Sequence, residues 1–183
     1  MDRKNSPSTT SGFQPGLSSE EIEEKLKVLP FCVSEEVREL YRWRNGDKTY
    51  SSVFGYLCLM NLDGACESSE HVNDEYLIEI REDQTEPRYL FPMFDFDGEY
   101  FATQGSGSLT KTSPIFHLDD CYGVSFAFIN LTAMMLTLAE CYETGVYSLG
   151  ENGTLEVIDR IKFGRIRQKY NPGTVESLYF GGW

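Results

Sequence analysis

The chain has 183 residues, a length that suits one domain with a hydrophobic core of its own. Its formal net charge is −13, and because phosphate backbones repel such a surface, nucleic acid is not an expected partner. No apolar stretch is long enough to span a membrane and no signal peptide is visible, so we expect a cytoplasmic protein without membrane association. The five cysteines include no C-x-x-C pair, and the two histidines lack suitable neighbours. The sequence therefore predicts free thiols, no metal site and no cofactor.

The first residues are typical of a flexible tail. Residues 1–16 are rich in Ser, Thr, Pro and Gly, and residues 17–183 form a single predicted domain. A helix is predicted to follow Ser18, because Ser18 and Glu21 have the spacing of a capping box. An apolar stripe leads from there to Pro30, which limits the helix.

A second helix is predicted from an N-cap at Ser34, with an apolar stripe in its middle and arginines in its last turn. Asn45-Gly46 supplies the left-handed residue that would end it. The next segment is ambiguous. Residues 53–60 fit a strand or a short helix, residues 61–73 fit a loop, and residues 75–80 fit a strand or part of a helix.

Strands dominate the middle of the chain. Residues 88–94 and 99–102 flank an Asp97-Gly98 turn, and a further strand is predicted at residues 113–118. The pattern favours antiparallel pairing, because hairpin turns rather than helices join most of the predicted strands.

The last part begins with the helix that has the clearest apolar stripe. Asn130 is its predicted N-cap, and Gly145 is predicted to end it. A hairpin across Asn152-Gly153 and a helix at residues 159–170 follow. We therefore expect an α+β fold, with an antiparallel or mixed β-sheet and helices packed mainly on one side.

One string suggests catalysis. Phe94-Asp95-Phe96-Asp97-Gly98 resembles the D-x-D-G motif of haloacid-dehalogenase-like phosphatases, in which the first Asp is the nucleophile and the second an acid/base. The resemblance implies a phosphohydrolase that uses Asp95 and Asp97. However, Glu99 stands where that family has Thr, and no βα repeats follow. A hairpin turn is the favoured interpretation, so we expect no enzymatic activity and no catalytic residue.

Exposed aromatic and acidic side chains are the candidates for a partner-binding surface. Trp43 falls on the flank of the second predicted helix, where it can anchor an interface or pack under the following loop. Asp119-Asp120 could bind a divalent cation, but a solvated turn is favoured, and His117 is interpreted as an ordinary strand residue. The predicted partner-binding residues are Trp43, Asp95, Asp97, Glu99, Asp119 and Asp120.

Several segments, taken in order, resemble the SUKH superfamily, which includes fungal cell-wall-assembly regulators and many bacterial proteins. They are an early Glu-rich helix, the Leu29-Pro30 step, the stretch from Leu40 to Gly46, Leu90-Phe91-Pro92 before the Asp97-Gly98 turn, the tract from Asn130 to Tyr147, and the ending from Gln168 to Gly173. The similarity spans residues 17–173, apart from a polar insert at residues 63–73. It implies an α+β fold and a non-enzymatic binding role.

Bacterial members of this superfamily are commonly immunity proteins that neutralise toxins, often nucleases. The resemblance thus implies a protein-binding domain whose partner is another protein, a basic toxin domain, toward which the acidic charge would steer it. Two alternatives stay open from the residues. One is a regulatory or scaffolding module without a toxin partner, and the other is the phosphohydrolase.

Overall fold

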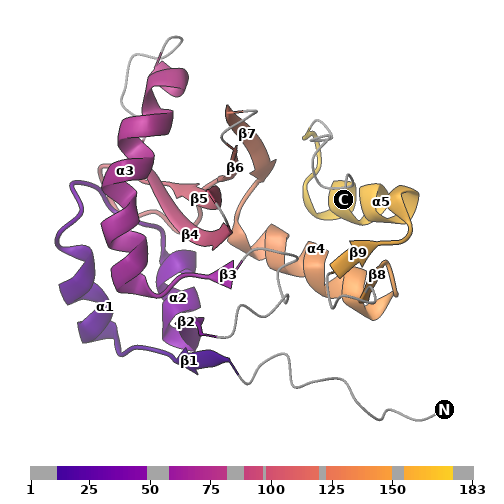
Figure 1. Ribbon diagram of the computed structural model, residues 1–183, viewed down its shortest axis with the longest axis horizontal. Helices are drawn as coiled ribbons and strands as arrows, with labels where there is room; N and C mark the ends of the chain where they lie inside the picture. Colours follow the sequence, from indigo (N-terminus) through magenta and orange to yellow (C-terminus); the bar gives the residue numbers. More distant parts are fainter. Residues whose placement is uncertain are drawn as a thin grey trace.

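The computed structural model describes residues 12–48, 58–81, 89–96, 98–119, 123–149 and 155–174 (Figure 1). Its helices are α1 (Ser19–Leu26), α2 (Glu35–Trp43), α3 (Leu62–Arg81), α4 (Leu131–Glu143) and α5 (Arg160–Tyr170). Its strands are β1 (Phe13–Pro15), β2 (Arg44–Asp47), β3 (Cys58–Leu59), β4 (Leu90–Phe96), β5 (Glu99–Gln104), β6 (Ile115–Asp119), β7 (Gly123–Phe128), β8 (Tyr147–Leu149) and β9 (Leu155–Val157).

The central sheet is a meander. Its strand order is β3-β4-β5-β6-β7, and each neighbouring pair is antiparallel. Two smaller antiparallel sheets pair β1 with β2 and β8 with β9. Because helices pack against the central sheet, the fold is α+β as the sequence predicts. Of the two predicted kinds of sheet, antiparallel or mixed, the described strands form the antiparallel one.

The two faces of the central sheet carry separate hydrophobic clusters. The larger cluster joins one face to α1, α2 and α4, and within it Tyr41 packs edge-on against Phe91, with ring centroids 6.4 Å apart. The other face buries Leu118 and its neighbours against Val72 and Tyr76 of α3. Most helices therefore cover one face, and the later turns of α3 cover the other.

α1 begins with the capping box that the sequence predicts. Ser18 Oγ accepts a hydrogen bond from the Glu21 N–H at 3.2 Å, and the Glu21 carboxylate accepts one from the Ser18 N–H at 2.8 Å. α2 also begins after its predicted N-cap, Ser34, but the Ser34 side chain makes no capping bond. Carbonyls of residues 110–111 accept from the first two N–H groups of α2 instead, which fixes this loop against the helix.

α2 ends at Trp43, before the predicted Asn-Gly stop. Arg44 is already extended and begins β2, which pairs with β1. Gly46 does have a positive φ of 91°, but it lies within β2 and does not end the helix. Only glycine fits here, because a Cβ would lie 2.7 Å from the backbone nitrogen of Asn61, the residue before α3. Residues 13–15, which the sequence assigns to the tail, form β1.

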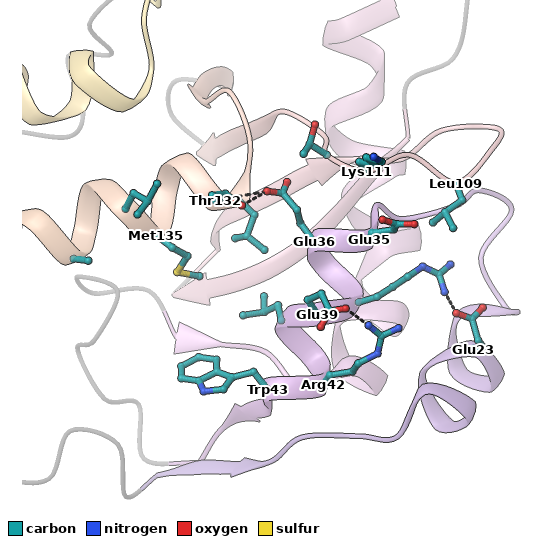
Figure 2. Close-up of a pocket in the computed structure, with 16 residues that line it drawn as sticks. Glu23, Glu35, Glu36, Glu39, Arg42, Trp43, Leu109, Lys111, Thr132 and Met135 are labelled. Atoms are coloured by element: carbon teal, nitrogen blue, oxygen red, sulfur yellow. Dashed lines mark hydrogen bonds and ion pairs between the residues drawn. The ribbon is translucent and has the colours of Figure 1, made fainter.

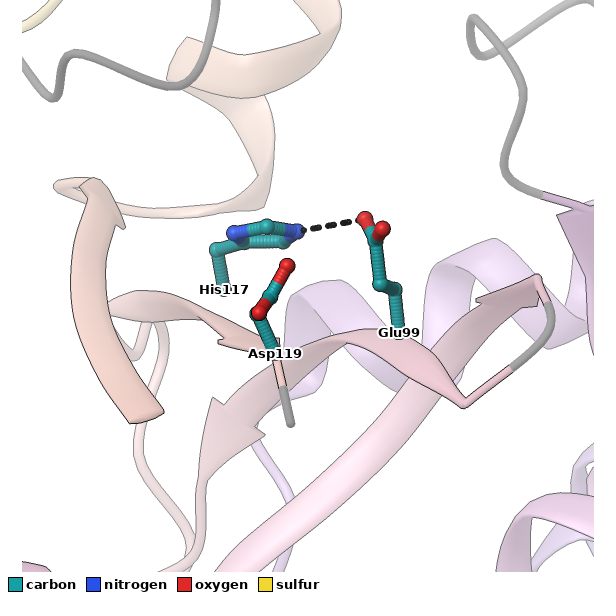
Figure 3. Close-up of side chains that lie close together, drawn as sticks. All are labelled: Glu99, His117 and Asp119. Carbon is teal, nitrogen blue, oxygen red and sulfur yellow. Dashed lines mark hydrogen bonds and ion pairs between the residues drawn. The ribbon is translucent and has the colours of Figure 1, made fainter. Parts of the chain in front are cut away.

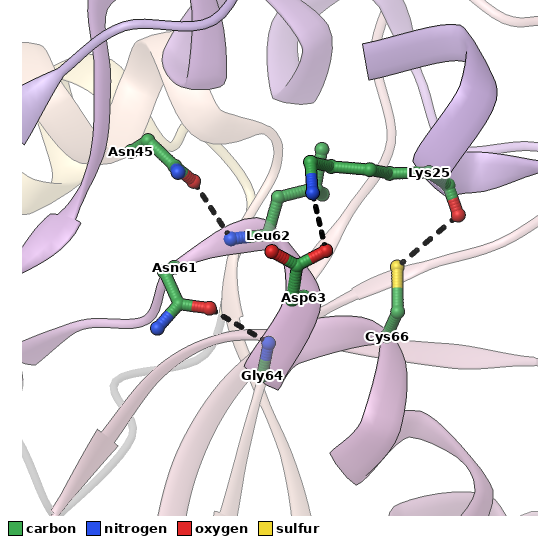
Figure 4. A network of polar contacts seen from close by, with 7 residues as sticks. All are labelled: Lys25, Asn45, Asn61, Leu62, Asp63, Gly64 and Cys66. Carbon is green, nitrogen blue, oxygen red and sulfur yellow. Dashed lines mark hydrogen bonds and ion pairs between the residues drawn. The ribbon is translucent and has the colours of Figure 1, made fainter. Parts of the chain in front are cut away.

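The prediction of a loop at residues 61–73 is wrong, because α3 runs through this segment. The Asn61 side chain caps the helix by accepting from the N–H three residues on, at 2.8 Å. Asn45 of β2 accepts from the first N–H of α3, also at 2.8 Å (Figure 4). An ion pair of 2.5 Å joins Lys25 of α1 to Asp63. Two of these three contacts come from β2 and α1, so the start of the helix depends in part on segments that are distant in the sequence.

Two polar residues, Ser69 and Asn73, lie within the otherwise apolar inner face of α3. The hydroxyl of buried Ser69 donates to the Leu90 carbonyl of β4 at 3.2 Å. The Asn73 amide accepts from the Leu90 N–H and donates to the Leu90 carbonyl, both at 2.8 Å. Asn73 thus pairs with Leu90 as a neighbouring strand would. The helix continues to Arg81, which decides the ambiguous residues 75–80 in favour of a helix.

The central hairpin is confirmed. β4 pairs with β5 from Leu90 opposite Gln104 to Phe96 opposite Glu99, and Gly98 between them has a φ of 93°. The predicted strand at residues 113–118 corresponds to β6. β7, for which the sequence analysis makes no assignment, pairs with β6 and extends the meander.

α4 has the predicted ends. The Asn130 side chain accepts from the Ala133 N–H at 2.8 Å, and Gly145 has a φ of 67° just after the helix. The face of α4 that carries Ala133 and Thr137 is also buried, and α5 packs against the helix (Figure 1). Thr137 on that face accepts from the side chain of Asn171, the residue after α5, at 3.3 Å. Within the described ranges, no helix has the length and hydrophobicity that a membrane crossing needs.

Candidate functional site

A surface groove of about 1050 Å³ lies between α2, the first turns of α4 and the loop at residues 109–112 (Figure 2). Side chains from α1 extend its charged border. The loop reaches this position because its carbonyls cap α2, as described above. The two N-terminal helices, the loop and α4, which are distant from one another in the sequence, therefore meet around one concave surface, where ligand and partner sites usually form.

Three large apolar side chains are exposed along this groove. Trp43, Leu109 and Leu136 are 47%, 52% and 44% exposed. The Trp43 ring packs against Phe13 of β1 at a centroid distance of 5.4 Å, and the Arg44 guanidinium lies 5.4 Å from the Trp43 centroid. These contacts restrict the indole, while half of it still faces solvent. Apolar side chains grouped in this way mark interaction surfaces more often than isolated ones do.

Most charges around the groove are paired within the chain. Arg38 forms an ion pair with Glu23 of α1, and Arg42 forms one with Glu39 one turn earlier (Figure 2). Burial lowers the pKa of Arg38, yet it leaves the guanidinium charged. Glu35 and Lys111 are exposed, and no ion pair is found for either within the described segments. The groove thus offers an apolar surface with a carboxylate and an ammonium that a partner can engage.

One carboxylate of the groove has a structural role. Glu36 of α2 accepts from the N–H of Thr132 at 3.0 Å and from the Thr132 hydroxyl. Thr132 is in the first turn of α4, where N–H groups lack partners in the helix and the dipole favours an anion. The second oxygen of Glu36 is buried and has no hydrogen-bond partner in the described part of the chain. Glu36 therefore joins the two walls of the groove.

The predicted partner-binding residues do not lie on one surface. Trp43 lines the groove, and Glu99 and Asp119 lie beside each other on β5 and β6. Asp95 pairs with Tyr100 and so faces the α3 side of the sheet, opposite to Glu99. Asp97 and Asp120 lie outside the described residues.

Asp95 lies in surroundings that differ from those implied by the D-x-D-G resemblance. It is on β4, between β3 and β5 of an antiparallel sheet, and not in an α/β core. Burial raises the pKa of the Asp95 carboxyl, which opposes the ionised form that a nucleophile needs.

One group of polar side chains is not predicted from the sequence. His117 of β6, interpreted as an ordinary strand residue, lies with Glu99 and Asp119, and the three possible ligand atoms are all within 4.8 Å of one another (Figure 3). His117 Nε2 is 3.2 Å from a Glu99 oxygen. Strand alternation places His117 and Asp119 on one face, so this signal was present. The sequence alone does not give the register between β5 and β6, which brings Glu99 beside these two residues.

Comparison with known proteins assigns no family, because the chain matches no family model and no curated protein. Function therefore has to be inferred from the groove, the charge and the order of the segments.

Proposed function

We propose that this chain is a non-enzymatic protein-binding domain that recognises a basic protein through the groove between α2 and α4. The observation that supports this proposal is the grouping of Trp43, Leu109 and Leu136, all exposed, in one concave surface. Binding energy in protein interfaces concentrates on a few such side chains that enter well-packed pockets, and Trp is prominent among them.

The charge of the chain supports a basic partner. The net charge of −13 produces an attractive field for cationic proteins and speeds their encounter with the acidic domain. Near the groove itself, Glu35 is an exposed carboxylate that can meet a cationic side chain. Apolar contacts with the groove would then determine the lifetime of the complex, while charge would determine the rate of its formation.

The particular function that we propose is that of an immunity protein, which neutralises a cognate toxin domain in the cytoplasm. This version rests on the resemblance to the SUKH superfamily in the order of the segments from Leu29-Pro30 to Gly173. A regulatory or scaffolding module without a toxin partner is the alternative, and it would use the same groove. The identity of the partner separates the two functions.

The groove proposal is tested by capture of partners on the tagged full chain, identification by mass spectrometry, and titration calorimetry with the purified partner. Leu136→Arg places a charge on the exposed part of α4 and should weaken binding at least tenfold, which is about 1.4 kcal/mol. Ile161→Arg is the matched control, because Ile161 is equally apolar, is exposed and lies on α5 outside the groove. It should leave affinity within about twofold, as expected for an interface-remote surface change.

A partner that binds both variants as tightly as the unchanged chain would contradict the groove proposal, and so would the absence of any partner. Weaker binding at higher salt is also expected, since a basic partner is attracted by exposed charges.

The toxin version is tested separately by co-expression of this chain with a toxin encoded by a neighbouring gene; the absence of any such toxin gene would count against this version. The unchanged chain should restore growth, and Leu136→Arg at the same expression level should not. Growth inhibition that persists with the unchanged chain, together with intact groove binding to a housekeeping protein, would favour the regulatory alternative.

A further inference from the structure

We propose that Glu99, His117 and Asp119 bind a divalent transition-metal ion such as Zn²⁺ on the face of the central sheet. The site shares no residue with the groove, so this inference is independent of the proposed function. Each residue offers one donor atom, and the three donors lie within 4.8 Å of one another (Figure 3). The shortest described separation is 3.2 Å, between His117 Nε2 and a Glu99 oxygen.

The register of β5 and β6 places two carboxylates opposite each other. Tyr100 pairs with Leu118 and Phe101 pairs with His117, so one further step brings Glu99 opposite Asp119. Like charges directly opposite in an antiparallel pair repel each other. A divalent cation bound between the two carboxylates attracts both of them and offsets their mutual repulsion. His117, two positions from Asp119, points from the same face and supplies a nitrogen donor.

Burial and packing hold the donors in place. His117 is 3% exposed and Asp119 is 8% exposed, so both residues are buried on this face of the sheet. The Phe101 ring packs edge-on against His117 at a centroid distance of 5.3 Å and restricts the imidazole. Glu99 is more exposed and borders solvent, which gives an ion a route to the site. Donors fixed on neighbouring strands lose little conformational freedom when they bind an ion.

The donor set indicates the class of ion. Imidazole with carboxylates suits Zn²⁺ and related first-row ions, whereas Mg²⁺ and Ca²⁺ prefer oxygen ligands alone. Donors at about 2.1 Å from a tetrahedral zinc ion lie about 3.4 Å apart. No pair therefore has to close by more than roughly 1.4 Å, a movement within the reach of side-chain rotation. Water would complete the coordination.

The test is zinc binding by the full chain after removal of metals with a chelator. A competition titration against a chromophoric zinc chelator should give one site per chain. His117→Gln, Asp119→Asn and Glu99→Gln should each weaken zinc binding at least tenfold, as removal of a ligand does. Mg²⁺ should not compete. His71→Gln is the matched control, because His71 and Glu75 form an exposed two-donor pair at 3.1 Å on α3. It should leave the zinc affinity unchanged.

Two further measurements separate this site from the free thiols and from a simple His–Glu ion pair. Co²⁺ in place of Zn²⁺ should give ligand-field bands without the charge-transfer band of a thiolate ligand. Zinc should raise the melting temperature of the unchanged chain, because an ion that binds only the folded state stabilises it, and should have no such effect on Glu99→Gln. Glu99→Gln is the informative variant here, since Glu99 is the most exposed of the three and its substitution should disturb the fold least.

The proposal is overturned if zinc does not bind, if binding survives His117→Gln, or if it is lost with His71→Gln. A thiolate band in the cobalt spectrum, or a melting temperature that zinc leaves unchanged, has the same consequence.

Discussion

Glu36 on α2 accepts two hydrogen bonds from Thr132 on α4, although the two residues are 96 positions apart in the sequence. One of these bonds comes from a backbone N–H in the first turn of α4, and the next N–H is satisfied by Asn130. The start of α4 is therefore capped partly by its own residue and partly by another helix. This contact fixes the spacing of the groove walls.

Removal of this contact should loosen α4 without changing the core. Glu36→Ala leaves the Thr132 N–H without its protein partner and is expected to lower the free energy of unfolding by about 1–2 kcal/mol. Glu35→Ala is the control, because Glu35 is also in the first turn of α2 but is exposed and caps no helix among the described residues. Denaturant unfolding followed by circular dichroism measures both. Equal destabilisation by the two substitutions would contradict the role of Glu36.

The contact between Asn73 and Leu90 should be a stability determinant that the hydrophobic pattern hides. Asn73→Ala removes the acceptor for the buried Leu90 N–H, while the Leu90 carbonyl keeps Ser69 as a donor. A cost of about 1–3 kcal/mol is expected for one buried donor left without a partner.

Asp74→Ala, on the exposed side of the same turn, should cost little. Amide hydrogen exchange at Leu90, measured together with denaturant unfolding, checks the result. Unchanged exchange at Leu90 in the Asn73 variant would show that this hydrogen bond contributes nothing.

The capping box of α1 predicts both a stability change and a pH dependence. Ser18→Ala should destabilise the chain by about 1 kcal/mol, and Ser108→Ala, an exposed loop control, should have no measurable effect. The Ser18 N–H holds the pKa of Glu21 below its usual value of 4.5. A lowered carboxyl pKa in the folded state gives stability that is present above the usual value and is lost as the pH falls through the folded-state pKa.

Unfolding of the unchanged chain and of Glu21→Gln between pH 7 and pH 3 tests this dependence, because Glu21→Gln removes the carboxylate that accepts from the Ser18 N–H. The difference in stability between the two should shrink at the acid end, where Glu21 of the unchanged chain is itself protonated and neutral. A constant difference across the range would be the contrary result.

The buried thiols should resist alkylation. Burial raises the pKa of Cys58 and that of Cys141 to about 11, so at pH 7.5 roughly one thiol in a few thousand is ionised. Treatment with iodoacetamide followed by peptide mass spectrometry should find both unmodified in the native chain. The same treatment in guanidinium chloride should modify them rapidly. Native modification at the unfolded rate would show that these thiols are accessible.

Features that depend on a few adjacent residues could be predicted from the sequence. The capping box at Ser18, the cap at Asn130 and the hairpin at Gly98 each need only local geometry, and all three are present. The beginning of α3 was missed because its stability comes from other segments. Asn45, Lys25 and Leu90 each contact this helix from other segments, and polar Ser69 and Asn73 interrupt the apolar stripe of its buried face.

The candidate sites could be predicted only in part for the same reason. Trp43 was identified because its position on the flank of a helix follows from periodicity. Leu109 and Leu136 join it through loop placement and through the Glu36–Thr132 contact, which no local signal contains. His117 joins Glu99 through the register of β5 and β6, and the connection between these strands spans residues 105–114.

The hairpin connections of the central meander also imply an order of assembly. β4, β5, β6 and β7 follow one another in sequence and in space, so their pairings close short loops and can form early. The groove requires contact between α2 and α4, and all strands of this sheet lie between these two helices in the sequence. It should therefore be completed late in folding and open first in local unfolding, with amides at the start of α4 exchanging faster than those of β5. Binding at the groove would act on this junction between distant segments, and a bound partner would slow its opening.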